Sequence, residues 1–379
     1  MSNAIALWTG EQLPSSSELS QIEGARFHLI HGYQPERDGY HWLKGVALAH
    51  YEGRWIASFG HNPDKYEENN RTEVSNCRMS VDNGQTWGPL LNIDSPSGDL
   101  ATSHGVFLIH DGTLWAFMGA FYGRGRPGGR VHTRAYVADV ESYRQGNPTW
   151  TRKGVVAWDG FWPTQEPILM GNGLYIVAGN CYGRRKGGKL VTRSTGAVDP
   201  AVALVDADDL TAWDVIEIAS PTAILGESAV MVDGPKVFLM ARSNENLLKA
   251  LVATSNDYGQ TWSGLQESNL PMATSKPYAG TLSTGRHYLV NTISSDVGQM
   301  FRNPLTIMIS ERGEMSFRKA YRIIDSRWPL PGAEEYTHWA YPYAAERDQH
   351  LWVGFYMGTE GRNRSGAAGV VVIPLESLE

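Results

Sequence analysis

The chain has 379 residues, with 33 Lys and Arg against 40 Asp and Glu, and a formal net charge of -7. This charge, carried without a basic tail, argues against a nucleic-acid partner, and no apolar run approaches the roughly 20 residues that a membrane helix needs. The charged fraction is only 19%, and 41 Gly with 13 Trp are typical of a turn-rich, aromatic-rich globule rather than a disordered chain or a coiled coil.

The N-terminal segment shows no basic start followed by an apolar core, so a secretory signal is not expected. The chain is then either cytoplasmic or the mature form of a secreted protein, and the compartment stays open. Cys77 and Cys181 lie far apart and are compatible with either paired or free thiols. We expect a single domain over residues 1–379 and a monomer.

Six segments along the chain share one pattern: a short apolar run, a turn with Gly or polar residues, and a second apolar run. Each pattern predicts a β-hairpin. The residues that open the six hairpins are Lys44, His104, Glu166, Glu227, Lys276 and Tyr341. They recur about every 60 residues, and no long stretch keeps helical spacing of apolar residues. The sequence therefore predicts an all-β protein, a β-propeller with six visible repeats.

A second repeat runs in phase with the hairpins. Residues 80–87 and 255–262 both fit the pattern S-x-D-x-G-x-T-W, and residues 310–317 are a degenerate copy. In such a turn the Asp can accept backbone N–H groups, the Gly supplies a positive φ, and the Trp packs between sheets.

The first 40 residues leave room for a seventh blade, and we expect residues 26–30 to close the ring by pairing with the C-terminal strands.

These two turns resemble the Asp boxes, or bacterial neuraminidase repeats, of sialidases and related glycan-cleaving propellers. The resemblance implies a sialidase-like β-propeller over nearly the whole chain. Asp boxes are structural, so they predict the fold and leave the activity to be argued from the site.

The innermost strands of a propeller begin at one mouth of its central channel. The residues that open the hairpins should therefore surround a common funnel: Lys44, His104, Glu166, Glu227, Lys276 and Tyr341. Five of these side chains are ionisable and the sixth is a tyrosine, which an apolar core would not select. The alternative is a wet channel whose polar lining performs no chemistry.

The resemblance to sialidases can be followed residue by residue. Glu227, Arg242, Arg302 and Tyr341 fall where that family has a Glu, two Arg and a Tyr nucleophile. The family's first-blade Arg is replaced by Lys44, and its acidic Asp has no convincing counterpart in residues 60–65. A sialidase-type exo-glycosidase that uses Tyr341 and Glu227 is therefore an alternative rather than the leading hypothesis.

The leading hypothesis is β-elimination from a uronate sugar. Lys or Arg side chains would neutralise the sugar carboxylate and acidify its C5 proton, and His104 could act as base and acid near neutral pH. The stretch around His104 resembles the L-rhamnose-α-1,4-D-glucuronate lyases, in which a funnel His is catalytic. That resemblance implies release of terminal L-rhamnose from glucuronate in side chains of the gum arabic type. The predicted catalytic residues are His104, Tyr341, Lys276 and Arg302.

The remaining predictions concern binding. The predicted substrate-binding residues are Lys44, Glu166, Glu227, Arg242, Trp339 and Arg134. Two basic, Gly-rich loops at residues 123–130 and 183–189 could contact an acidic glycan at the rim. The expected partner is an acidic oligosaccharide or polysaccharide, with neither nucleic acid nor membrane. No metal-ligand spacing is present, so no cofactor is expected, although a structural cation could occupy the channel. A glycan-binding propeller without catalysis is the third alternative.

Overall fold

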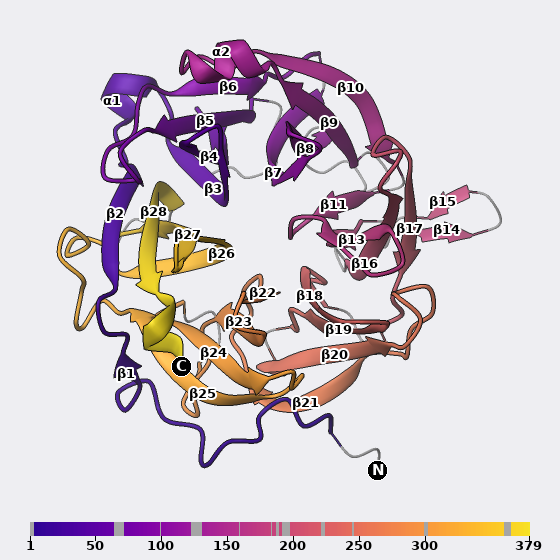
Figure 1. The fold of residues 1–379 in the computed structure, drawn as a ribbon, viewed down its shortest axis with the longest axis vertical. Coiled ribbons are helices and arrows are strands. Elements are labelled where there is room, and N and C mark those ends of the chain that lie inside the picture. Colours follow the sequence, from indigo (N-terminus) through magenta and orange to yellow (C-terminus); the bar gives the residue numbers. More distant parts are fainter. Residues whose placement is uncertain are drawn as a thin grey trace.

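The computed structural model describes residues 4–63, 72–98, 100–122, 131–158, 160–182, 184–186, 189–191, 198–220, 224–244, 246–298, 302–359 and 365–379. Its sheets are arranged as blades around a central axis (Figure 1). Among the described residues, no helix has the length and apolar character needed to cross a membrane. The all-β propeller predicted from the repeats is confirmed, with six blades.

The blades follow one another in chain order. Blade 1 contains β3 (Trp42–Tyr51), β4 (Arg54–Asn62), β5 (Val74–Ser80) and β6 (Leu91–Asp94). Blade 2 contains β7 (Leu100–His110), β8 (Thr113–Tyr122), β9 (His132–Ala138) and β10 (Trp150–Ala157). Blade 3 contains β11 (Phe161–Pro163), β12 (Ile168–Leu169), β13 (Leu174–Cys181), β16 (Asp199–Asp206) and β17 (Trp213–Glu217).

The second half of the ring continues the same plan. Blade 4 contains β18 (Ser228–Asp233), β19 (Lys236–Ala241), β20 (Lys249–Ser255) and β21 (Gln266–Pro271). Blade 5 contains β22 (Tyr278–Thr281), β23 (Arg286–Asn291), β24 (Leu305–Arg312), β25 (Phe317–Ile324) and β1 (Ser20–Gln21). Blade 6 contains β26 (His338–Arg347), β27 (His350–Gly358), β28 (Ser365–Pro374) and β2 (Arg26–His31).

Smaller elements decorate the ring. A separate hairpin of β14 (Arg184–Lys186) and β15 (Lys189–Val191) projects outward from blade 3 (Figure 1). The short helices are α1 (Pro35–Asp38), α2 (Val140–Arg144) and the 3-10 helix η2 (Leu375–Leu378).

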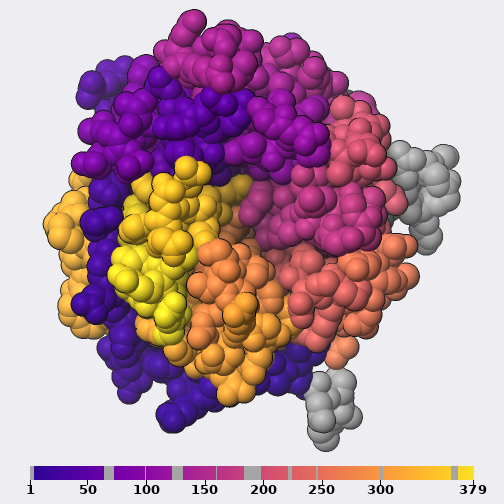
Figure 2. Space-filling view, in the orientation of Figure 1, coloured from indigo at the N-terminus to yellow at the C-terminus, as the bar shows by residue number. Residues whose placement is uncertain are grey.

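The N-terminal region builds no seventh sheet among the described residues. Instead, β1 pairs in parallel with β25, and β2 pairs antiparallel with β28. Blade 6 therefore contains strands from both ends of the chain. The N-terminal residues lie along the edge of the disc, beside the C-terminal residues (Figure 2).

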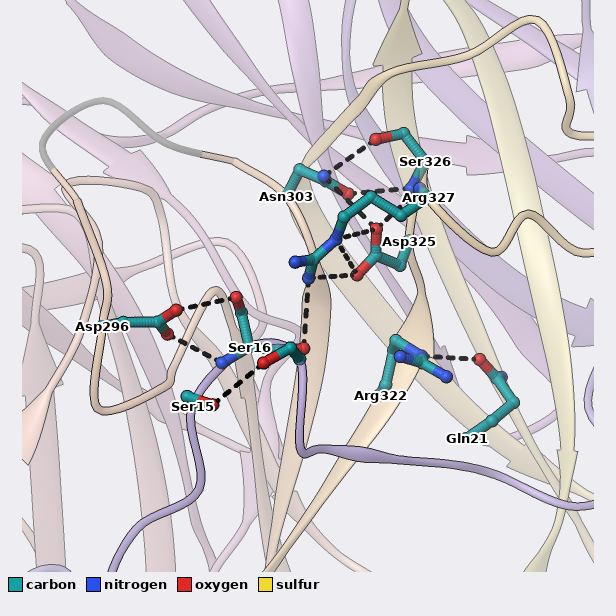
Figure 3. Close-up of polar contacts among 10 residues, drawn as sticks. Ser15, Ser16, Gln21, Asp296, Asn303, Arg322, Asp325, Ser326 and Arg327 are labelled. Atoms are coloured by element: carbon teal, nitrogen blue, oxygen red, sulfur yellow. Dashed lines mark hydrogen bonds and ion pairs between the residues drawn. The ribbon is translucent and has the colours of Figure 1, made fainter.

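The segment before β1 is tied to blade 5 by polar contacts (Figure 3). The backbone N–H and hydroxyl of Ser16 donate to the carboxylate of Asp296 at 2.7 and 2.9 Å, and Arg327 donates to the Ser16 carbonyl at 3.1 Å. Arg327 is in turn paired with the fully buried Asp325 at 2.7 Å. These contacts attach the N-terminal segment to the outer side of the ring.

The Asp-box turns form as their sequence predicts. In the first box, Asp82 accepts the N–H of Thr86 at 2.9 Å, and the Ser80 hydroxyl accepts the N–H of Gly84 at 2.9 Å. Asp82 also accepts a hydrogen bond from the Thr86 hydroxyl, and this bond, followed by that of the Thr86 N–H, lowers the pKa of Asp82 to about 2. The indole of Trp87 donates to the Gly84 carbonyl at 3.1 Å. The box at 255–262 repeats these bonds at 2.9, 2.9 and 2.8 Å.

Candidate active site

Three inner strands are irregular at the place where the funnel residues stand. The pairing of inner and second strands shifts register between Lys44 and Ala47, between Thr102 and Gly105, and between Ala340 and Tyr343. Extra residues in one strand bend it and re-aim its side chains. Lys44, His104 and Tyr341 therefore leave the regular pleat of β3, β7 and β26 near their starts.

Backbone conformation at two of these bulges is left-handed. Tyr341 has a φ of 54° and Gly45 a φ of 67°. A Cβ atom on Gly45 would stand 2.1 Å from the imidazole ring of His104, so no larger residue fits at this position. The His104 ring is thereby held against the backbone of the neighbouring blade.

Tyr341 is the point at which the predicted site residues meet. The Nζ atom of Lys44 lies 4.3 Å from the centre of the Tyr341 ring, and the guanidinium carbon of Arg302 lies 5.7 Å from it. The ring centre of His104 is 6.1 Å away, in an edge-on arrangement. Arg242 donates a hydrogen bond to the Tyr341 hydroxyl at 3.2 Å. Four predicted residues from four different strands or loops thus surround one phenol.

The carboxylate of Glu227 is ionised. Burial by itself would raise its pKa, but the adjacent Arg242, then Lys44 and a hydrogen bond from Tyr341, outweigh burial and lower the pKa of Glu227 to about 2. Arg242 forms an ion pair with Glu227 in which both side chains are nearly buried. Burial, followed by the charge of Glu227, raises the pKa of Tyr341 well above 10, so this phenol is protonated at neutral pH.

His104 has the opposite environment. Burial, followed by the positive charges of Lys44 and Lys276, lowers the pKa of His104 to about 3. Its ring also packs on Trp162, with ring centres 5.0 Å apart. The imidazole is therefore neutral at pH 7 and has a free lone pair, although its basicity is low while Lys44 and Lys276 stand beside it.

A short relay decides which nitrogen of His104 carries the proton. The hydroxyl of Ser103 donates to the carboxylate of Glu73, and it lies 3.0 Å from the Nδ1 atom of His104. A hydroxyl has one proton to donate, so the Ser103 oxygen accepts from Nδ1–H. This assigns the lone pair to Nε2. Glu73 and Ser103 were not predicted as site residues, although Ser103 adjoins His104 in the chain.

Lys276 and Glu166 form a second polar group in the ring. Lys276 donates to the Pro342 carbonyl at 2.8 Å, and burial lowers the pKa of Lys276 to about 8. Burial also raises the pKa of Glu166 to about 7, against the opposing hydrogen bond from Tyr278. The Tyr278 hydroxyl contacts both Glu166 and the Ala344 carbonyl, the latter at 2.8 Å. When Glu166 is protonated, the carboxyl proton and the Tyr278 hydroxyl proton together satisfy the contact between Glu166 and Tyr278 and the contact between Tyr278 and the Ala344 carbonyl.

Two predicted binding residues have other roles. Trp339 has 0% exposure and belongs to the main hydrophobic core, so it cannot stack on a bound sugar. Arg134 lies on β9, where it pairs with Asp94 of blade 1 at 3.0 Å and donates to His132 at 3.1 Å. It links two blades, and these predictions for Trp339 and Arg134 are corrected accordingly.

The structure adds one further residue to the site. The Tyr356 hydroxyl accepts a hydrogen bond from Arg302, and its ring centre lies 5.4 Å from that of Tyr341. Tyr356 lies on β27, the second strand of its blade, and no motif in the sequence marks it. The predicted loop contacts at 123–130 lie outside the described residues, as does part of the loop at 183–189. Within the described ranges, no group of three or more His, Cys, Asp or Glu side chains could hold a metal ion.

A six-bladed ring with Asp-box turns and a polar inner mouth defines a sialidase-like β-propeller. The sequence pattern of the family described as "BNR repeat-like domain" matches residues 105–353. The chain therefore belongs to the BNR repeat-like domain family. A comparison with curated protein sequences gives no match.

Several solved structures share the fold. A protein of unknown function from Dyadobacter fermentans has a TM-score of 0.64 and 16% identity, covering 93% of this chain and all of its own. A variant of the NanB sialidase from Streptococcus pneumoniae has a TM-score of 0.65 and 12% identity, covering 93% of this chain and 71% of that one. The Hadza microbial sialidase Hz136 has a TM-score of 0.68 and 15% identity, covering 93% of this chain and 69% of that one. At these identities the likeness concerns the fold.

Proposed function

We propose that this protein is a carbohydrate-active lyase that cleaves a uronate-containing glycan by β-elimination. The observation that carries the proposal is the protonation pattern around the ring. His104 is neutral with its lone pair on Nε2, while Tyr341 is protonated at a ring-centre distance of 6.1 Å. A neutral base and a protonated acid are the pair that elimination requires.

The cations supply the third requirement. Arg302 and Lys276 supply positive charge at the inner mouth of the ring, and Arg242 is shared with Glu227. Burial lowers the pKa of Lys44 to about 7, so Lys44 is only partly charged at neutral pH. A uronate carboxylate held by such groups delocalises the negative charge that develops when its C5 proton is removed. The ring therefore suits a sugar with a carboxylate better than a neutral sugar.

In the proposed reaction, Nε2 of His104 takes the C5 proton. The electron pair of the C5–H bond forms the C4–C5 double bond, and the C4–O4 bond breaks. Tyr341 gives its proton to the departing O4, so one 4,5-unsaturated uronate and one free hydroxyl are formed. No oxidant or reductant is needed. Solvent then returns the two residues to their starting states.

The specific substrate is proposed from the resemblance around His104. We infer an exo-acting enzyme that releases terminal L-rhamnose from α-1,4-linked D-glucuronate, as in gum arabic side chains. In that linkage O4 leaves together with the rhamnose. An acidic oligosaccharide or polysaccharide is accordingly the proposed partner of the ring.

Hydrolysis by Tyr341 is the second candidate, because Glu227 and Arg242 both interact with its hydroxyl. In that mechanism Tyr341 attacks the sugar after giving its proton to Glu227. The pKa of Glu227 is lowered to about 2 and that of Tyr341 is raised well above 10. The transfer of the Tyr341 proton to Glu227 is therefore unfavourable before substrate binds. Burial and the neighbouring lysines also make His104 a weak base in the absence of substrate. We favour elimination because a bound uronate carboxylate would add negative charge beside His104 and raise the pKa of its imidazole.

The test follows ultraviolet absorbance of the unsaturated uronate and free rhamnose together, with a rhamnosyl-glucuronate as substrate. We expect both products from the native protein and a loss of about 10²–10⁴-fold in rate for His104→Ala, the usual contribution of a general base. His50→Ala is the matched control, because His50 lies farther along the same β3 strand as Lys44. Rhamnose without absorbance would indicate hydrolysis. Binding without either product would indicate a glycan-binding propeller.

A further inference from the structure

A cavity of about 440 Å³ lies between blade 6 and blade 1, away from the ring of Tyr341. β26 begins near Tyr341, and the turn at its far end, residues 347–350, lines this cavity. The cavity therefore opens on the face opposite the candidate active site. Its volume falls within the range of ordinary small-molecule sites, about 300–1,000 Å³.

The lining is basic and polar over an aromatic base. Arg26 and His28 come from β2, Arg347 and His350 from the turn of blade 6, and the amides of Asn83 and Gln85 from the first Asp box. Trp352 lies at the base and packs on Trp55, with ring centres 4.3 Å apart and the ring planes tilted by 33°. The single acidic lining residue, Asp348, is paired with Arg347 at 3.0 Å.

Several of these polar groups are available to a ligand. Within the described part of the chain, the side chains of Arg26, His28 and Asn83 make no hydrogen bond or ion pair. His350 contacts the Asp348 carbonyl through Nδ1 at 2.7 Å, which leaves its Nε2 lone pair unused. The cavity thus presents the Arg26 guanidinium, the Asn83 amide and imidazole nitrogens without internal partners, while the Gln85 amide donates one hydrogen bond to the Asp82 carbonyl at 3.1 Å.

The turn that carries the amides is fixed in place. Asn83 has a φ of 53°, and the following Gly84 has a φ of 73°. A Cβ atom on Gly84 would stand 2.5 Å from the ring of Trp352, so the backbone rests directly on the indole. The amide of Asn83 is therefore carried by a rigid turn rather than by a mobile loop.

The second Asp box provides an internal comparison. It also stands over the preceding blade and borders a cavity, of about 700 Å³. That cavity is lined by Leu174, Leu204, Ile216, Trp213, Ala212 and Gln260, with Asp206 and Asp214 as its only charged residues. The same turn architecture thus forms a basic polar cavity in one place and an apolar, acidic one in the other. The basic lining is a property of the first cavity and does not follow from the Asp box.

We propose that the cavity between blades 6 and 1 is a second binding site, for a carboxylate-bearing sugar unit. Arg26 and Arg347 would hold the carboxylate, Asn83 and Gln85 the hydroxyl groups, and the edge of Trp352 the apolar face of the ring. Two arginines match the planar carboxylate, and amides match sugar hydroxyls. The choice of a uronate as ligand rests on the proposed function. The site would anchor the acidic polymer on the face opposite the reaction.

The experiment titrates the full chain with D-glucuronate, and with D-glucose as the uncharged control, while NMR follows the indole signal of Trp352. The signal is assigned with Trp352→Phe. We expect glucuronate to shift this signal, glucose to leave it in place, and added salt to weaken the effect because charged contacts are screened. In the double variant Arg26→Gln with Arg347→Gln, we expect affinity at this site to fall at least about ten-fold, the effect of losing about 1.4 kcal/mol. Arg318→Gln, an exposed arginine on β25, is the matched control.

Two further readouts separate this site from the ring. His104→Ala should leave the Trp352 response unchanged, and the double variant should leave turnover of the small rhamnosyl-glucuronate unchanged. The proposal would be overturned if the Trp352 signal did not respond to glucuronate. It would also be overturned if the double variant, with an unchanged thermal unfolding curve, responded as strongly as the native protein. A normal Trp352 response in a protein that forms no unsaturated product would reject the proposed function and retain the second site.

Discussion

The two sides of the inner ring hold their titratable groups in opposite states. On the blade 4 side, Glu227 stays charged because Arg242 is paired with it. On the side of blades 2 and 3, burial keeps His104 uncharged and raises the pKa of Glu166 to about 7. All three groups are enclosed at the same mouth. The difference shows that the direct ion pair with Arg242, and not the degree of burial, keeps Glu227 charged.

The largest effect on the charged side is expected from Glu227→Gln. Removing one member of a buried ion pair leaves Arg242 uncompensated, which costs about 3–5 kcal/mol of unfolding free energy. Chemical denaturation of the native and variant proteins measures the loss. If elimination is the reaction, the variant should still form the unsaturated product at a temperature where it is folded. A folded variant that loses all turnover while His104→Ala retains it would reverse the roles assigned to the two sides.

The neutral side is tested by Ser103→Ala. Without the Ser103 oxygen, Nδ1–H of His104 loses its acceptor, and we expect a rate loss of about ten- to hundred-fold, equivalent to the roughly 1.5–3 kcal/mol of a hydrogen bond to a charged group. Nitrogen NMR of the His104 ring reports the tautomer directly. The native protein should show protonated Nδ1, and the variant a mixture of both forms. Protonated Nε2 in the native protein would contradict the relay from Glu73.

A smaller effect is expected from Glu166→Gln, and it concerns pH. The folded-state pKa of Glu166 is about 7, above its unfolded value, so the folded protein binds more protons between these two values. Its stability should therefore fall as pH rises toward 7, with a slope of up to about 1.4 kcal/mol per pH unit. Glu166→Gln should remove this part of the slope. The measurement is the unfolding free energy of both proteins from pH 5 to pH 8, a range chosen because the unperturbed pKa of Glu is about 4.3 and the raised value is about 7. If Glu166 were ionised throughout this range, the two proteins would show the same dependence of stability on pH.

Much of the fold could be predicted from the sequence because its determinants are local. Alternating apolar residues and Gly turns specify each hairpin, and the pattern from Ser80 to Trp87 specifies a turn through bonds within eight residues. The position of His104 or Tyr341 at the start of an inner strand follows from the same periodicity. The seventh blade was not predictable in this way, since a short N-terminal strand can pair with existing sheets instead of forming its own.

The site was only partly predictable, because its chemistry depends on contacts between blades. Glu73 reaches His104 through Ser103 only after blades 1 and 2 have packed together, and no spacing in the chain marks that relay. In the sequence, Trp339 cannot be told apart from a tryptophan that stacks on a sugar, yet packing places it in the core. Tyr356 enters the site from a second strand, where the alternation of residues gives no hint of function.

The sequence by itself determined the number and order of the β-hairpins, the Asp-box turns and the residues at the inner mouth of the ring, since these depend on short-range periodicity and turn chemistry. The tertiary structure alone decided which of those residues is charged, which nitrogen of His104 is free and where the basic cavity of Arg26 and Arg347 forms. Proton affinity and charge complementarity depend on distances between side chains from different blades and on the removal of water, and both are set only when the ring is assembled.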